Sequence, residues 1–306
     1  MEAAGQDLFF PTINVLASPI SKVGNTALRS FLYAAEITQQ NYTSDADRIR
    51  NFHSHLAPGT EIHNPASRIK EHLTRKGQYR ESLSVVILRD PVDRFLSMYV
   101  DMFALAQIPI RIAPYLQHEW MVKSTDELTN VHERVLRLLN WLEVDNHINV
   151  DEHWTPQVNF MVPNFTYDIT LDINNLHSLP QRLAHSSQKL HWLENIEMPV
   201  RHQSNSTVQN LLGTEEIRAR ISSLYADDYT LRESLDLPTS VPPQVDTSTS
   251  QLDWPTIRTD LLGQQINNLT EVLTQQWRYF ELSRAMRLAR AIKRNQKRLQ
   301  RLFPFR

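Results

Sequence analysis

The clearest indication of fold class in this chain is the segment Leu83-Ser84-Val85-Val86-Ile87-Leu88-Arg89-Asp90-Pro91. Its first six residues form a short apolar run rich in β-branched side chains, which is typical of a buried strand in a parallel sheet. Pro91 suits the first turn of a helix, where its missing N–H group does no harm. The apolar stripe that follows consists of Phe95, Met98, Tyr99, Met102 and Phe103. The stretch therefore predicts a strand, a turn and an amphipathic helix.

The same order of elements is predicted upstream. Leu8 to Ala17 is rich in strand-forming residues and runs into Ser18-Pro19, which suits a strand entering a loop. Asn25 or Thr26 can cap the helix that follows. An amphipathic helix is predicted at Asp126 to Leu142, and a late helix that packs on this domain at Glu215 to Leu235. Because strands alternate with helices, we expect an α/β fold with a mainly parallel sheet and helices on both faces.

The composition of the chain excludes several kinds of protein and of functional site. The chain has 306 residues and a net charge of -2, so its overall charge argues against nucleic-acid binding. It has no cysteine, which excludes disulfides, thiolate metal sites and cysteine nucleophiles. The first residues do not combine a basic region with an apolar stretch, and no apolar run is long enough to cross a bilayer. These features favour a cytoplasmic location.

The C-terminal part differs in character from the rest. Residues 238–253 are rich in Pro, Ser and Thr and are predicted to be a linker between a domain at 1–237 and a helical extension at 254–306. From Ser283 to Arg306 the extension is strongly basic and contains no acidic residue. That pattern suits either peripheral association with an anionic membrane or self-association. The alternative is a solvated helix that packs back on its own domain.

Two loops at strand ends are candidate anion sites. Lys22-Val23-Gly24-Asn25-Thr26 opens a helix, so free backbone N–H groups and the Lys22 ammonium could surround a phosphate. The loop has one glycine and its lysine precedes it, so it lacks the P-loop signature. Arg89 ends the predicted buried strand, where it could grip a second phosphate, and Ser97 follows two helical turns later. Arg94 either contributes to that anion site or forms an ion pair with Asp90 or Asp93.

Both loops resemble the donor site of sulfotransferases that use 3′-phosphoadenosine-5′-phosphosulfate (PAPS). Pro-x-x-Lys-Val-Gly-Asn-Thr-x-x-Arg, from Pro19 to Arg29, is similar to their 5′-phosphosulfate loop. Leu-Arg-Asp-Pro-x-x-Arg-x-x-Ser-x-Tyr, from Leu88 to Tyr99, is similar to their 3′-phosphate motif. The resemblance covers about residues 8–237 and implies a P-loop-NTPase-like fold, with Lys22 on the bridging oxygen and the sulfuryl group. It also implies the product 3′-phosphoadenosine-5′-phosphate (PAP) and no metal.

A third segment, Asp151-Glu152-His153-Trp154-Thr155-Pro156-Gln157, narrows the resemblance to the carbohydrate sulfotransferase branch. Its members act on glycan or glycolipid acceptors, and a Trp face beside imidazole and amide donors suits a sugar ring. The resemblance therefore suggests His153, Trp154 and Gln157 as acceptor contacts. The alternative is a buried Trp at a loop. The branch usually continues with cysteines, whereas this chain has Phe160, Met161 and Val162, so the shape of the acceptor loop does not carry over.

Sulfuryl transfer needs a base for the acceptor hydroxyl, and a histidine or glutamate works best near neutral pH. Ile62-His63-Asn64 resembles a short His-Asn element of the carbohydrate branch. His63 is therefore the first candidate for the base and Glu61 the second. An exposed loop histidine without a catalytic role is the alternative for His63.

Two other functions stay open at this point. One is a small nucleotide-dependent kinase with a degenerate phosphate loop, which would need Mg²⁺, whereas sulfuryl transfer from PAPS needs none. The other is a non-catalytic interaction protein that works through the basic C-terminal helix. Such a protein should not respond to PAP in a thermal-shift screen, whereas a sulfotransferase should.

Overall fold

The computed structural model describes residues 8–56, 82–105, 119–123, 125–144, 147–161, 166–198, 206–238, 254–264 and 266–267. The elements in chain order are β1 (Leu8–Phe10), β2 (Val15–Ser18), α1 (Asn25–Asn41), α2 (Asp45–Asn51), η1 (Phe52–His55), β3 (Leu83–Leu88), α4 (Pro91–Tyr99), the π-helical turn η2 (Val100–Ala104), α6 (Leu128–Glu143), η3 (His147–Asn149), η4 (Gln157–Phe160), β4 (Ile169–Asp172), η5 (Ile173–Ser178), α7 (Leu179–Ser186), η6 (Gln188–Asn195), α8 (Ser206–Leu212), α9 (Glu215–Leu224) and α10 (Ala226–Ser234). A further helical stretch covers 254–264.

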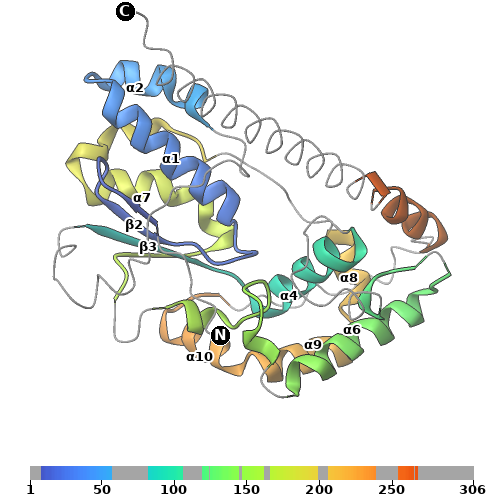
Figure 1. Ribbon diagram of the computed structural model, residues 1–306. Coiled ribbons are helices and arrows are strands. Elements are labelled where there is room, and N and C mark those ends of the chain that lie inside the picture. The colour runs from blue at the N-terminus through green and yellow to red at the C-terminus, as the bar shows by residue number, and fades with distance from the viewer. Residues whose placement is uncertain are drawn as a thin grey trace, which may run out of the picture.

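Four strands form one sheet in the order β1-β2-β3-β4 (Figure 1). β1 is antiparallel to β2, whereas β2, β3 and β4 are parallel to one another. The register pairs Ser18 with Val86, and Leu88 with Asp172. The predicted α/β fold with a mainly parallel sheet flanked by helices is confirmed. The loops after β2 and β3 leave the sheet at the same edge, where ligands of open α/β sheets bind.

Several element boundaries differ from those predicted. Leu8 to Ala17 is a hairpin rather than one strand, because the chain turns at residues 11–14 and Asn14 adopts a positive φ of 55°. The Glu36 carboxylate stabilises that turn by accepting from the Thr12 and Ile13 N–H groups at 3.0 Å. The late helix is broken at Tyr225 into α9 and α10. The strand β4 was not predicted.

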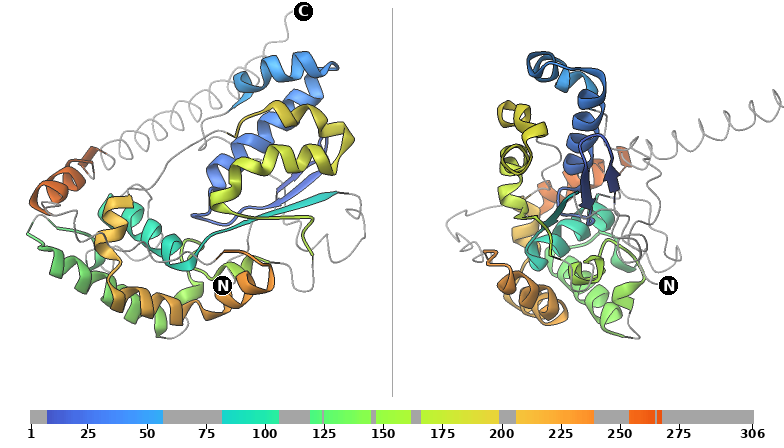
Figure 2. Two further views of the ribbon diagram at one scale, coloured as in Figure 1. Left: turned by 180° about the vertical axis from the view of Figure 1, so that it is seen from behind. Right: turned by 90° about the vertical axis from the view of Figure 1, so that its left-hand side faces the viewer.

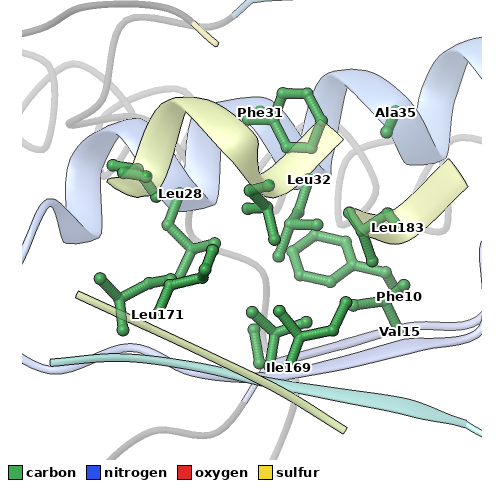
Figure 3. Close-up of a cluster of buried hydrophobic side chains, with 14 of the residues drawn as sticks. Phe10, Val15, Leu28, Phe31, Leu32, Ala35, Ile169, Leu171 and Leu183 are labelled. Atoms are coloured by element: carbon green, nitrogen blue, oxygen red, sulfur yellow. The ribbon is translucent and has the colours of Figure 1, made fainter. Parts of the chain in front are cut away.

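The first hydrophobic core fills the space between the sheet and the helices α1 and α7. Figure 3 shows Phe31 and Leu32 of α1 and Leu183 of α7 facing Val15 and Ile169 of the sheet. These side chains are fully or almost fully buried. The apolar stripe of α1 therefore fixes the helix that begins at the Lys22–Thr26 loop.

A second core lies among helices on the far side of the sheet from α1 and α7 (Figures 1 and 2). It is built by α4, η2, α6, α8 and α9, and Phe95, Tyr99 and Leu138 are among its buried residues. Within the described ranges, no helix has the length and apolar character needed to cross a bilayer.

The beginning of the C-terminal extension packs on this second core. Trp254 and Leu261 are buried in it, and the Trp254 indole N–H donates to the Asp126 carbonyl at 3.0 Å. Arg258 donates to the same carbonyl at 2.8 Å. The first turns of the extension thus have a partner surface within the chain. The basic part, from Ser283 onward, lies outside the described residues.

Candidate functional site

The loop between β2 and α1 has an unusual backbone. Lys22 has a φ of +69° and Gly24, the residue before α1, has a φ of +78°. A Cβ atom at position 24 would lie 2.5 Å from Ile173 Cδ1 and 2.9 Å from Leu176 Cδ2, so η5 packs directly against the loop. A positive φ is uncommon for a residue other than glycine, such as Lys22, and residues of this kind are often found at functional sites. The strained turn directs the chain around the N-terminus of α1.

The N-termini of α1 and α4 differ in capping. In α4, the Asp90 carboxylate caps the helix by accepting from Val92 N at 2.9 Å and from Asp93 N at 3.3 Å. In α1 no side chain caps the first turn, and that turn contains no acidic residue. The positive end of the α1 dipole is therefore the one that suits an external anion.

Arg89 connects the two predicted half-sites. It follows β3 directly, and its Nη1 donates to the Lys22 carbonyl at 3.2 Å. Burial lowers the pKa of Arg89, and the carboxylates of Asp93, Asp101, Asp90 and Asp172 oppose that shift. A largely desolvated guanidinium bound to the Lys22 backbone is well placed for a phosphate group.

Arg94 has a structural role that the sequence did not predict. It is 2% exposed, and its guanidinium donates to the carbonyls of Ser21 at 2.9 Å, Thr155 at 2.8 Å and Glu152 at 3.1 Å. The predicted alternative of a surface ion pair with Asp90 or Asp93 is therefore wrong. Burial lowers the pKa of Arg94. The side chain joins α4 to the Lys22 loop and to the loop at 151–157.

Lys22 forms an ion pair with Asp101. Its Nζ lies 2.5 Å from Asp101 Oδ2, and the two side chains are only 13% and 16% exposed. Burial lowers the pKa of Lys22, Asp101 raises it, and the nearby Arg89 and Arg94 lower it further. Asp101 was missed by sequence reasoning. The available signal was its spacing, because Arg94, Ser97 and Asp101 recur at helical intervals along one face.

The remaining predicted donor residues lie on the two helices. Ser97 is buried on α4, between Arg94 and Asp101 in the sequence. Asn25 and Thr26 begin α1, and the Asn25 Oδ1 atom is buried without a hydrogen-bond partner. Burial lowers the pKa of Arg29, one turn further along α1, and Glu152 opposes that shift. In the fold, Lys22 contacts both Arg89 and Asp101. Arg29 lies on α1 and Ser97 on α4, the helices that follow the two loops.

The side chains of the segment 151–157 differ in exposure to solvent. Trp154 is 0% exposed, donates from Nε1 to the His147 carbonyl at 3.1 Å and packs edge-on against Trp141. Its ring therefore offers no face to a sugar, contrary to the prediction. His153 keeps part of its surface, and its Nδ1 lies 2.6 Å from Asp151 Oδ1.

Gln157 is also buried and bonds to protein groups rather than to solvent. Its side chain pairs with the backbone of Arg89, and its N–H donates to the Asp228 carboxylate at 2.9 Å. Asp228 also accepts from Val158 N at 2.9 Å. Burial raises the pKa of Asp228, and Arg94 and these hydrogen bonds oppose the shift. Gln157 is thus a support for Arg89 rather than an acceptor contact.

The two candidates for the base, His63 and Glu61, lie outside the described residues. A search of the described part of the chain finds no group of three or more His, Asp or Glu side chains that could hold a metal ion.

Comparison with known proteins identifies the family. The model of the Sulfotransferase family matches residues 8–231, which is well over half of the chain. The match includes both anion loops, the segment 151–157 and Asp228. Searches of the curated proteins and of the solved structures each gave no match. From the match over residues 8–231, the chain belongs to the sulfotransferase family.

Proposed function

We propose that this protein transfers a sulfuryl group from PAPS to a hydroxyl group of a carbohydrate acceptor. The observation that carries the proposal is the contact between Arg89 and the Lys22 loop at the carboxyl edge of parallel strands. Membership of the sulfotransferase family supports sulfuryl transfer in general. The resemblance of both loops to PAPS motifs supports the choice of donor, and with it a P-loop-NTPase-like arrangement of the sheet.

The cationic side chains and free N–H groups of the two loops match the negative charges of PAPS. Lys22, with the backbone N–H groups of the uncapped α1, would hold the 5′-phosphosulfate. Arg89 and Ser97 would hold the 3′-phosphate, and Arg29 adds positive charge near the first turn of α1. PAPS supplies the reactive sulfuryl group when it is bound. The side chains of this protein orient it and offset developing negative charge, which needs no metal in the proposed reaction.

Catalysis would depend most strongly on Lys22. An ammonium group near the bridging oxygen stabilises the negative charge that develops there as the sulfur–oxygen bond breaks. The acceptor hydroxyl loses its proton to a base, for which His63 and Glu61 remain the candidates. We propose His153 as an acceptor contact, because Asp151 holds its ring and part of the side chain stays accessible.

Binding of PAP tests the donor assignment. Isothermal titration calorimetry should show binding by the wild-type protein, and Arg89→Ala should weaken it by about 2–5 kcal/mol if the phosphate contact is desolvated. Arg137→Ala is the matched control, because Arg137 is exposed on α6 and pairs with Glu133 there. Equal affinity of wild type and Arg89→Ala for PAP would count against the assignment.

Labelled PAPS with a panel of glycans and lipids tests the acceptor class. We expect label on a carbohydrate hydroxyl, and less of it with His63→Ala or with Glu61→Gln, whichever residue is the base. Transfer to non-carbohydrate acceptors alone would keep the sulfotransferase activity and overturn the carbohydrate assignment.

We also propose a cytoplasmic protein whose basic C-terminal helix binds an anionic membrane surface. Between Ser283 and Arg306 the sequence carries many Lys and Arg residues, no acidic residue, and interspersed Leu and Phe residues. Co-sedimentation with phosphatidylglycerol vesicles, compared with neutral vesicles, checks this. Self-association without vesicle binding would favour the alternative role of the helix.

A further inference from the structure

Arg94 of α4 and Asp101 of η2 contact the loop between β2 and α1, and Ser97 lies between them in the sequence. Arg94, Ser97 and Asp101 follow one another at intervals of three and four residues, so they share a helix face. Arg94 holds the Ser21 carbonyl and Asp101 holds the Lys22 ammonium. Asp101 lies in the π-helical turn that continues α4, and such turns are frequent at functional sites.

Lys22 is fixed by both its backbone and its side chain. Its φ of +69° is uncommon, its carbonyl accepts from Arg89 at 3.2 Å, and its Nζ lies 2.5 Å from Asp101. The charged groups that act on the Lys22 ammonium are Asp101, Arg89 and Arg94. Asp101 is therefore the carboxylate that acts on the Lys22 ammonium, against the two neighbouring guanidinium groups.

An anionic donor needs the same ammonium group. The 5′-phosphosulfate of PAPS would bring negatively charged oxygens to Lys22, where the Asp101 carboxylate already lies within 2.5 Å. Two anions in a poorly solvated site repel each other strongly, so they compete for one cation.

We propose that Asp101 is a positioning residue that holds the Lys22 ammonium before the donor binds. When PAPS binds, Lys22 leaves Asp101 and pairs with the 5′-phosphosulfate. This inference rests on the proposed function. Asp101 holds the Lys22 ammonium toward η2 until the donor binds. Because PAPS must displace the Asp101 carboxylate from Lys22, this ion pair weakens the binding of PAPS.

The proposal predicts a gain of affinity from the loss of a buried ion pair. Asp101→Asn keeps the shape of the side chain and removes its charge. Calorimetry with PAPS in the absence of acceptor should show about tenfold tighter binding than in wild type. Because PAP lacks the sulfuryl oxygens, its affinity should rise less. A residue that only supports the fold would give weaker binding instead.

A double-mutant cycle separates competition for Lys22 from general repulsion. In a Lys22→Met background, Asp101→Asn should change PAPS affinity by less than twofold, since no ammonium remains to be released. If the tenfold gain persists in that background, simple repulsion explains it and the exchange is wrong. Asp227→Asn, an exposed carboxylate on α10, is the control for net charge and should leave affinity unchanged.

The outcomes also separate this inference from the proposed function. Failure of the wild-type protein to bind either PAPS or PAP would overturn both. Wild-type binding with equal or weaker PAPS affinity in Asp101→Asn would overturn the role of Asp101 alone. Asp101→Ser, measured in parallel with thermal unfolding of every variant, keeps the test valid if Asp101→Asn folds poorly.

Discussion

Gln157 holds the backbone of Arg89 on both sides. Its Oε1 accepts from Arg89 N at 2.9 Å and its Nε2 donates to Arg89 O at 2.8 Å, across 68 positions of sequence. Gln157 is in turn held by Asp228, which accepts from its backbone N–H at 2.9 Å. The residue that would bind the 3′-phosphate is thus oriented by a buried amide, and this relationship leads to the first prediction.

Gln157→Ala should weaken PAP binding and destabilise the protein. The substitution leaves both backbone groups of Arg89 without their partners, which costs about 1–3 kcal/mol for a buried group. Denaturant unfolding and PAP titration measure the two effects. Asn159→Ala is the matched control, because Asn159 lies in the same η4 turn and its amide bonds to Asn149 in an exposed setting. If the two variants behave alike, Gln157 does not support Arg89.

Arg94→Lys should lower the free energy of unfolding almost as much as Arg94→Met. The guanidinium donates to three carbonyls from three different nitrogen atoms. A lysine ammonium keeps the charge but lacks this planar set of N–H donors. We expect a loss of about 2–3 kcal/mol in the free energy of unfolding, because buried carbonyls lose their donors. Full stability of Arg94→Lys in urea unfolding would mean that charge alone matters at this position.

Gly24→Ala should destabilise the loop that begins α1. Its φ of +78° disfavours a side chain, and the added Cβ would lie 2.5 Å from Ile173 Cδ1. Strain and overpacking together should cost about 2–4 kcal/mol. Gly263→Ala is the control, because nothing lies within 4 Å of its Cβ position in a helix. That variant should be neutral or stabilised by about 0.5–1 kcal/mol. Equal thermal unfolding midpoints for the two alanine variants would contradict this account.

Local sequence signals predicted the elements that carry the site. The run from Leu83 to Leu88 was predicted as a strand and forms β3 with those bounds, because an apolar β-branched run followed by Asp90 and Pro91 allows little else. β4 was not predicted because it has only four residues, too few for a clear pattern, and it is defined by its pairing with β3.

The contacts of the site could not be predicted in the same way. Lys22 and Asp101 are separated by 79 positions, and Arg94 bonds to carbonyls 58 to 73 positions away. Helical spacing indicates that Arg94, Ser97 and Asp101 share a face, but their partners depend on how the loops meet at the sheet edge, which local periodicity does not encode. The sequence shows the motif around Trp154, but the burial of its ring depends on packing against Trp141, which the motif does not encode.

The C-terminal boundary of the domain differs between the sequence and the structure. Sequence composition places it at 237, before the linker, and predicts that a protein truncated there stays folded. The structure adds that Trp254 and Leu261 are buried in the second core and that Trp254 bonds to the Asp126 carbonyl. Truncation after Leu237 would expose the surface that they cover, at about 25 cal/mol per Å² of apolar area.

We therefore expect truncation after Asn267 to preserve the thermal unfolding midpoint, and truncation after Leu237 to lower it by several degrees. Trp254→Ala in the full chain should reproduce much of that loss, since truncating a buried Trp costs about 3–5 kcal/mol. Ile266→Ala, at an exposed apolar side chain of the same segment, is the matched control and should be neutral. If the protein ending at Leu237 is as stable as the one ending at Asn267, residues 254–264 rest on the second core without stabilising it. The extension is then an appendage from its first turn, as its composition suggests.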